Sequence, residues 1–353
     1  MKSFKLLLSL IVILGLLAIL AGCPKIADKA VSVEPKGMVY FNFFDTVSYI
    51  YSYAGDSQED FETRCKGASE LLQEYHNLFD IYYEHTGVVN LRTLNLTAGG
   101  EAMKVDEKLI DFLLYAKQLY EITGGEMNIM MGSVLSIWHD CREQAGETPS
   151  AARIPTEEEL SEARLHTDFS LLEIDEENST VRISDPKASI DVGALGKGYA
   201  TEKAAQYLKS VGADHYVLNI GGNIRIIGHK VDGSGWGTGV KNPAAPDTYI
   251  KTITLADTSC VTSGNYERYF VVDGQRYHHI IDKDTLMPST YFAAVTVITP
   301  DSGLADALST ALFAMDYEDG LELVQKLGNV DVFWITPDGT QYMTPGFEKL
   351  VKE

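Results

Sequence analysis

Cysteine is scarce in this chain of 353 residues, and its few cysteines are not arranged as ligands or redox pairs. They are Cys23, Cys65, Cys141 and Cys260, and no two of them have the spacing of a metal or redox motif. A chain this long can bury a large core, so it does not need the disulfide framework of a small secreted protein. We therefore predict ordinary buried thiols at positions 65, 141 and 260.

Positive charge is also scarce. The chain has 29 Lys and Arg against 50 Asp and Glu, so its net charge is −21. A field of that sign repels nucleic acid and anionic lipid, and we expect no nucleic-acid partner. It also repels phosphate groups, so any phosphate site in this protein needs a metal ion or a local cluster of cations. No internal repeat and no low-complexity tract appears in the sequence.

One long apolar run occurs, at the very start of the chain. Lys2 and Lys5 precede the apolar stretch 6–20, which is shorter than the roughly 20 residues of a spanning helix. The sequence LAGC at 20–23 then looks like a bacterial lipobox, which is cleaved before a cysteine that becomes acylated. We predict a signal peptide at 1–22, lipidation of Cys23 within a tether at 23–37, and a domain at 38–353. This places the domain on the extracytoplasmic face of a bacterial cell membrane, held by lipid; an uncleaved anchor helix is the alternative.

The periodicity of apolar residues predicts an α+β fold, with mixed or antiparallel sheets and helices packed on them. Helical spacing indicates helices at 60–83, 106–123, 198–211, 304–315 and 317–327. Strand patterns occur at 40–53, 216–220, 224–229, 235–240, 249–255, 269–272, 293–298 and 330–335, with a hairpin over 169–183. The range 142–161 is typical of an exposed loop that leads into a helix, which Thr156 and Glu159 begin with a capping box.

Asp306 and Thr310 stand four residues apart on the helix expected at 304–315, so their side chains share one face. A carboxylate and a hydroxyl in that arrangement can ligate a hard cation, which takes oxygen ligands and keeps some positions for substrate phosphate. The alternative is ordinary surface polarity. It fits less well, because the neighbouring residues are apolar nearly all round and a buried Asp without a partner is costly.

The segment 191–200 (DVGALGKGYA) places three glycines ahead of a predicted helix. Glycine lets the backbone approach a phosphate, the start of a helix favours an anion, and Lys197 adds a positive charge. The segment matches neither the GxxxxGK[ST] phosphate loop nor the GxGxxG dinucleotide fingerprint. On the residues alone, a structural turn before an amphipathic helix is an equal alternative.

Three further segments combine polar groups with glycine or histidine. They are NIGGN at 219–223, TSGNYER at 262–268 and HHIID at 278–282. The Gly-Gly pair predicts a tight turn, with a structural role for Asn223. The second segment is expected to be a loop, in which Arg268 could pair with a phosphate or with Glu267. Histidine is the usual general base near neutral pH, although on the residues alone a structural histidine is the commoner case.

Taken together and in this order, these four segments and ADALST at 305–310 resemble the ApbE family of FAD:protein FMN transferases. The resemblance covers about 39–347 and implies an ApbE-like, T-fold-like catalytic domain. It implies an enzyme that takes FAD as substrate and Mg²⁺ as cofactor. Such an enzyme transfers FMN to a Thr or Ser hydroxyl of an acceptor protein and releases AMP. The implied acceptor is a flavoprotein subunit of an extracytoplasmic electron-transport system.

The resemblance also implies roles for individual residues. Mg²⁺ would lie on Asp306, Thr310 and the backbone carbonyl of Ala194, and the catalytic residues would be His279, Asp306 and Lys197. Asp282 is near enough in sequence to orient His279. Contacts with FAD are implied for Phe44, Tyr82, Glu126, Met127, Asn128, Asp191, Lys197, Ser263, Arg268, His279 and Ile280. This sequence departs from the commoner Asp-Pro-x-Thr-Gly-x-Pro pattern at 282–288, where it reads DKDTLMP.

Two other functions stay open at this point. An FAD pyrophosphatase would use water in place of the acceptor hydroxyl and would release free FMN and AMP. A lipid-anchored FAD-binding protein would hold the nucleotide without turnover.

Overall fold

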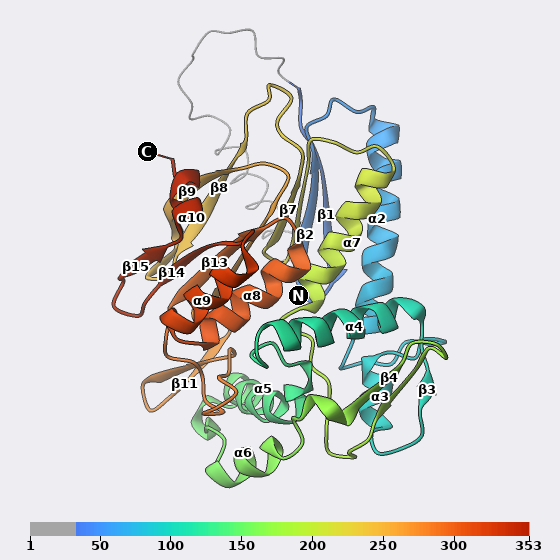
Figure 1. Cartoon of the computed structure of the whole chain (residues 1–353), viewed down its shortest axis with the longest axis vertical. Helices are drawn as coiled ribbons and strands as arrows, with labels where there is room; N and C mark the ends of the chain where they lie inside the picture. The colour runs from blue at the N-terminus through green and yellow to red at the C-terminus, as the bar shows by residue number, and fades with distance from the viewer. Residues whose placement is uncertain (1–32, 353) are drawn as a thin grey trace. The chain divides into compact units, whose positions relative to one another are not determined.

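The computed structural model describes residues 33–352, which belong to one compact unit. Its main element is an eight-stranded sheet in which every strand pairing is antiparallel (Figure 1). In spatial order its strands are β1 (Lys36–Phe43), β2 (Thr46–Ser52), β6 (Tyr216–Ile220), β7 (Asn223–Ile227), β10 (Ser259–Gly264), β13 (Ala294–Thr299), β14 (Asp331–Ile335) and β15 (Gln341–Met343). The α+β fold with antiparallel sheets predicted from the sequence is confirmed.

Helices cover one face of this sheet (Figure 1). They are α2 (Gln58–Phe79), α7 (Gly196–Ser210), α8 (Ser302–Ala314) and α9 (Tyr317–Leu327). The hairpin of β8 (Trp236–Asn242) and β9 (Ala245–Leu255) and the short helix α10 (Pro345–Leu350) pack on the other face. Successive side chains of a strand point to opposite faces of the sheet, so neighbouring residues of β14 pack against different layers. Trp334 packs in the cluster with α8, whereas Phe333 packs against Phe347 of α10.

A second group of elements packs beside the ends of α2 and α7 (Figure 1). It comprises α3 (Leu91–Leu96), β3 (Met103–Lys104), α4 (Glu107–Ile122), α5 (Gly132–Glu147), α6 (Glu157–Arg164), β4 (Leu172–Asp175) and β5 (Thr180–Ile183). The hairpin of β11 (Tyr269–Val272) and β12 (Gln275–His278) rests on α5, with the Trp138 and Tyr277 rings 6.0 Å apart. Trp138 Nε1 also donates to the Leu286 carbonyl at 2.9 Å, which fixes the loop after the hairpin.

Most predicted elements agree with the structure to within a few residues, and the capping box of Thr156 and Glu159 is confirmed. Three predictions are wrong, and two of them concern where an element turns or ends. The range 40–53 is a hairpin rather than one strand, because the chain turns at Phe44 and Asp45, whose φ angles are 51° and 52°. The first part of the loop predicted at 142–161 belongs to α5, which continues to Glu147.

The loop predicted at 262–268 is also corrected, because Thr262, Ser263 and Gly264 belong to β10. Several elements were not predicted at all, namely α3, β3, α5, β12, β15 and α10. The sequence of β12 is QRYH, which has no apolar alternation, and its strand form comes from pairing with β11. Such pairing is a tertiary effect that overrides a weak local preference.

The three cysteines within the described range are free and buried, as predicted. Burial raises the pKa of Cys65 and of Cys260 to about 12, so neither thiol is a nucleophile at neutral pH. Between residues 33 and 352, no helix has both the length and the apolar character needed to cross a membrane. The predicted signal peptide, Cys23 and most of the tether lie outside the described residues, while Lys36 and Gly37 already belong to β1.

Candidate active site

The first turns of α7 and α8 meet at Gly198. The Gly198 N–H donates to Asp306 Oδ2 at 2.8 Å. A Cβ atom on Gly198 would lie 2.3 Å from Asp306 Cβ and 2.4 Å from the Ser302 carbonyl oxygen, so only glycine allows this approach. The sequence suggested that this glycine makes room for a phosphate, but in the structure it makes room for the neighbouring helix.

Asp306 is a buried carboxylate, with only 5% of its surface exposed. Burial raises its pKa, and this effect is opposed by the charge of Lys197, by the Gly198 N–H and by the Asn223 side chain. Within residues 33–352, Asn223 Oδ1 is buried without a hydrogen-bond partner. A cation beside Asp306 would stabilise its ionised form, and oxygen atoms are already gathered there to hold one.

Three hydroxyl groups on α8 and β10 form a hydrogen-bonded group next to this region. Ser263 Oγ on β10 lies 2.8 Å from Ser309 Oγ and 3.3 Å from Thr310 Oγ1. Ser309 Oγ donates to the Asp306 carbonyl at 2.9 Å, so it accepts from Ser263. Asp306 and Thr310 do lie one turn apart on α8, and Ser263 contacts Thr310 from the neighbouring strand. Carboxylate and hydroxyl oxygens of this kind are the donors that a hard divalent cation prefers. Ala194, whose carbonyl the resemblance implied as a third ligand, is partly buried in the segment just before α7.

Cations gather around His279 and Asp191. Burial and then the charges of Arg268, His278, Lys197 and Arg142 lower the pKa of His279 to about 3. Burial raises the pKa of Asp191, and this is opposed by the Gly193 N–H and by His139, Lys197 and Arg268. We call Lys197, Arg268 and Arg142 the cationic cluster. Arg142 was missed by the sequence analysis, which placed it in a loop instead of on α5.

The arrangement around Lys197 and Arg268 leaves both charges available to a ligand. Lys197 Nζ donates to the Gly193 carbonyl at 3.1 Å. Glu267, the partner that the sequence suggested for Arg268, pairs instead with Lys241 at 2.9 Å. Among the described residues, Arg268 has no ion pair with a carboxylate at all. A positive group of this kind inside a protein of net charge −21 is a suitable anion site.

The two adjacent histidines have different environments. His278 is buried; its Nε2 lies 2.9 Å from the Ser289 carbonyl, and its Nδ1 accepts from the Ile280 N–H at 3.3 Å. His279 Nδ1 lies 3.2 Å from the Arg268 carbonyl, so it acts as the donor and leaves Nε2 with a free lone pair. Among the described residues, His279 is thus the one of the two that keeps a ring nitrogen without a hydrogen-bond partner.

Asp282 does not orient His279. Its Oδ1 accepts from the N–H groups of Asp284 and Thr285, at 2.7 and 3.0 Å, and so fixes the loop that follows. That loop is the one whose sequence departs from the common family pattern. It brings Lys283 to within 3.0 Å of Glu126, so the Glu126 carboxylate is held in an ion pair.

The other implied FAD contacts divide into accessible and inaccessible side chains. Tyr82 is 49% exposed and its ring lies 5.4 Å from that of His139; Phe44 is partly buried, with its ring 5.5 Å from that of His76. Both rings can meet a ligand.

The side chains of Met127 and Ile280 are 3% and 5% exposed and belong to the core, so only their backbones could contact a substrate. Asn128 has a structural role: it caps the turn at Met130 N and donates to the Thr167 carbonyl. Core packing therefore accounts for the side chains of Met127 and Ile280, and local hydrogen bonding accounts for that of Asn128.

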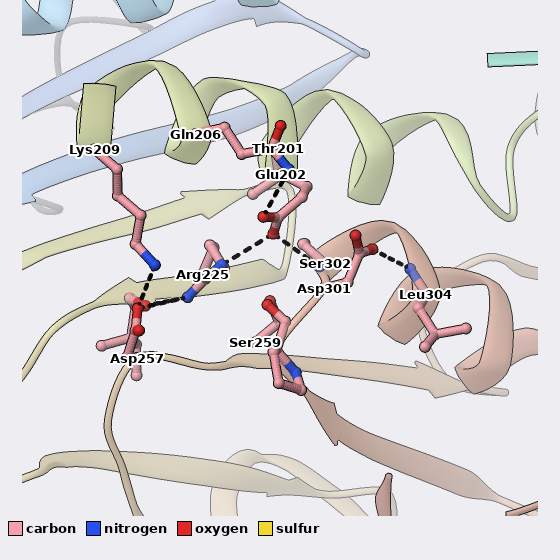
Figure 2. Close-up of polar contacts among 12 residues, drawn as sticks. Thr201, Glu202, Gln206, Lys209, Arg225, Asp257, Ser259, Asp301, Ser302 and Leu304 are labelled. Carbon is pink, nitrogen blue, oxygen red and sulfur yellow. Dashed lines mark hydrogen bonds and ion pairs between the residues drawn. The ribbon is translucent and has the colours of Figure 1, made fainter. Parts of the chain in front are cut away.

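Figure 2 shows the polar network that joins α7, β7 and the start of α8, one turn from Gly198. Glu202 Oε2 accepts from Arg225 Nε at 3.0 Å and from the Ser302 N–H at 3.1 Å. Arg225 also lies 3.4 Å from Asp257, which pairs with Lys209 at 2.7 Å. No sequence motif indicated this network, because its members come from separate elements.

The ApbE family model matches residues 45–334, and the chain belongs to the ApbE family. A FAD:protein FMN transferase of Treponema pallidum is 32% identical over 263 residues, which is 70% of this chain and 71% of that protein. The FAD:protein FMN transferase of Vibrio cholerae is 28% identical over 350 residues, 97% of this chain and 99% of its own length. The relatives are enzymes named for flavin transfer, which confirms the enzyme class predicted from the motifs.

Solved structures of the family agree with the fold. The ApbE protein of Thermotoga maritima superposes with a TM-score of 0.78 at 30% identity, covering 91% of this chain and all of that one. A histidine-to-glycine variant of the V. cholerae flavin transferase ApbE gives a TM-score of 0.74 at 27% identity, covering 90% and 99%.

Proposed function

We propose that this protein is a Mg²⁺-dependent FAD:protein FMN transferase, which moves FMN from FAD to a Thr or Ser hydroxyl of an acceptor protein and releases AMP. The observation that carries the proposal is the placement of Asp306. Its buried carboxylate is held by the Gly198 N–H, lies near the hydroxyl-bearing residue Thr310 on the same helix, and feels the charge of Lys197. This combination supplies both ligands for a cation and a counter-charge for a pyrophosphate.

Mg²⁺ would be held by Asp306, Thr310 and the Ala194 carbonyl. When bound, the ion supplies a Lewis acid that stabilises negative charge developing on the pyrophosphate. The donor set suits it, because the Gly198 N–H holds the Asp306 carboxylate in place through Oδ2 and carboxylate oxygens are ligands that Mg²⁺ prefers. The hydroxyl network of Ser263 and Ser309 orients Thr310 beside it.

The chain's own residues would bind the substrate and move one proton. Lys197 and Arg268 bind the pyrophosphate, and Tyr82 and Phe44 offer rings to the flat parts of FAD. The acceptor oxygen attacks the phosphorus of the FMN half, the bond to the AMP oxygen breaks, and AMP leaves. His279 Nε2 accepts the proton of the acceptor hydroxyl. The anionic substrate raises the pKa of His279 on binding, so the residue becomes a stronger base in the complex than in the free protein.

Mass spectrometry of a Thr-containing acceptor domain tests this proposal. The domain is incubated with the full chain in detergent, FAD and Mg²⁺. We expect the acceptor to gain the mass of one FMN phosphoryl group and AMP to appear in equal amount, both only without EDTA. Release of AMP with free FMN and an unmodified acceptor would instead assign the pyrophosphatase. If FAD stays intact and binds at one per chain, the protein is instead a non-catalytic FAD-binding protein.

We also propose that the chain is a lipoprotein anchored through Cys23 and facing an extracytoplasmic acceptor of an electron-transport system. The lipobox-like sequence at 20–23 supports this. Membrane fractionation should find wild-type protein with the membrane and a Cys23→Ala variant uncleaved and without lipid mass. A wild-type protein that keeps residues 1–22 would contradict the anchor.

A further inference from the structure

Three potential metal ligands meet where α2 ends. His76 lies in the last turn of α2, Asp80 is the residue that caps the helix, and His85 follows in the next loop. Each offers one ligand atom, and these atoms all lie within 4.8 Å of one another. His85 Nε2 is already 2.9 Å from Asp80 Oδ2. The group uses none of the residues assigned above to Mg²⁺.

The carboxylate of this group is held in a fixed orientation. Asp80 Oδ1 accepts from the N–H groups of Tyr82 and Tyr83, at 2.7 and 2.9 Å, so Oδ2 alone faces the histidines. Backbone bonds of this kind orient a ligand in the way that outer hydrogen bonds do in known metal sites.

We propose that His76, Asp80 and His85 form a Zn²⁺ site with three protein ligands and one open coordination position. Two imidazole nitrogens and one carboxylate are a donor set that Zn²⁺ takes readily, and three such ligands leave a fourth position for water. Mg²⁺ suits this site less well than Zn²⁺ does, because Mg²⁺ prefers oxygen donors to imidazole nitrogens. The same protein would thus hold two different ions, one on oxygen atoms at Asp306 and one on nitrogen atoms at the end of α2.

Zinc binding has a necessary consequence for Phe44. His76 Nδ1 now accepts from the Phe44 N–H at 3.2 Å. If the ion takes Nδ1, that bond is replaced. If it takes Nε2, the ring proton moves to Nδ1, which can no longer accept. Either way the turn between β1 and β2 loses this restraint, and Phe44 is a residue that we expect to face FAD.

Calorimetric titration of the full chain in detergent with Zn²⁺ tests the site, with excess Mg²⁺ present to fill the oxygen site. We expect one Zn²⁺ per chain, and at least about tenfold weaker binding in Asp80→Asn and in His85→Gln. His215→Gln is the matched control, because His215 is also partly exposed and lies 3.8 Å from Asp214. That variant and Asp306→Asn should bind Zn²⁺ as the wild type does.

Two further readouts separate a metal site from a structural cluster. Co²⁺ in place of Zn²⁺ should give the visible absorption of a four-coordinate ion in the wild type and in the two control variants, but not in His85→Gln. Zn²⁺ should also speed hydrogen exchange of the Phe44 amide. His85→Gln keeps both backbone bonds to Asp80, so it remains decisive if Asp80→Asn is unstable. Zn²⁺ binding that is absent at micromolar concentrations, or equal in wild type and His85→Gln, would overturn the proposal.

Discussion

Two side chains of the site, Asp306 and His279, are both held toward their neutral forms by burial. The pKa of Asp306 is raised and that of His279 is lowered, because a poorly solvated site disfavours either charge. A cation beside Asp306 would lower the pKa of that residue, and an anion beside His279 would raise the pKa of that one. The free site is therefore poised to take a metal ion together with an anionic substrate, and perturbed groups of this kind are characteristic of functional sites.

Acid should destabilise the protein through His279. Between its folded pKa of about 3 and the ordinary value of 6.5, the unfolded state binds a proton that the folded state does not. The free energy of unfolding therefore falls as pH falls through this range. Denaturant unfolding of wild type and His279→Asn at pH 7 and pH 5 checks this: the wild type should lose more stability than the variant. Equal losses would contradict the lowered pKa of His279.

At the scale of elements, the site depends on how closely α7 approaches α8. Gly198→Ala would force the two helices apart, because the new methyl group would overlap Asp306 and the Ser302 carbonyl. We expect a loss of about 1–3 kcal/mol in unfolding free energy and a weaker dependence of transfer on Mg²⁺.

Gly146→Ala on α5 is the control for Gly198→Ala. A Cβ there meets no atom within 4 Å, so alanine should be neutral or stabilising by up to about 1 kcal/mol. Denaturant unfolding gives both values. Equal effects of the two substitutions would contradict the close approach of the helices.

The network of Figure 2 should stabilise the same junction. Arg225 and Glu202 side chains are only 5% and 11% exposed, so Glu202→Gln leaves a buried cation with a weakened partner. We expect a loss of about 3–5 kcal/mol. The double variant Glu202→Gln with Arg225→Met should lose less than the sum of the two single losses, because neither charge is then left alone.

Lys209→Met provides the comparison on the exposed side of that network. The Lys209 and Asp257 side chains are 39% and 50% exposed, and such pairs contribute about 1 kcal/mol or less. Urea unfolding of the two single variants Glu202→Gln and Arg225→Met, their double variant and Lys209→Met measures the four losses in unfolding free energy. A loss in Lys209→Met as large as that in Glu202→Gln would show that burial does not decide the strength of this network.

Local patterns were enough to predict some elements and not others. The helices α7, α8 and α9 and the strands β6 and β11 have clear apolar periodicity, and the sequence places each of them closely. The turn at Phe44, the short strand β12 and the network of Glu202 and Arg225 depend on contacts between distant segments. No window of sequence contains those contacts, so local reasoning could not find them.

In the whole molecule, the overall negative charge contrasts with a local cluster of cations. A net charge of −21 makes the protein as a whole repel a dinucleotide, and the sequence therefore required a metal ion or local cations. The structure brings Lys197 of α7, Arg142 of α5 and Arg268 of the loop before β11 together around His279. The need for such a cluster could be derived from composition, and two of its members lay in recognised motifs. Arg142 could not be found, because its place depends on how α5 packs.

The most direct test of the central claim compares FMN transfer by wild type and by Asp306→Asn. Each protein is incubated with FAD, Mg²⁺ and a Thr-containing acceptor domain, and the acceptor is weighed by mass spectrometry over time. The amide keeps the size of the side chain but removes the charge that a cation needs. We predict that the variant stays folded and transfers FMN at least about 100-fold more slowly. Transfer at the wild-type rate by a folded Asp306→Asn protein would contradict the account.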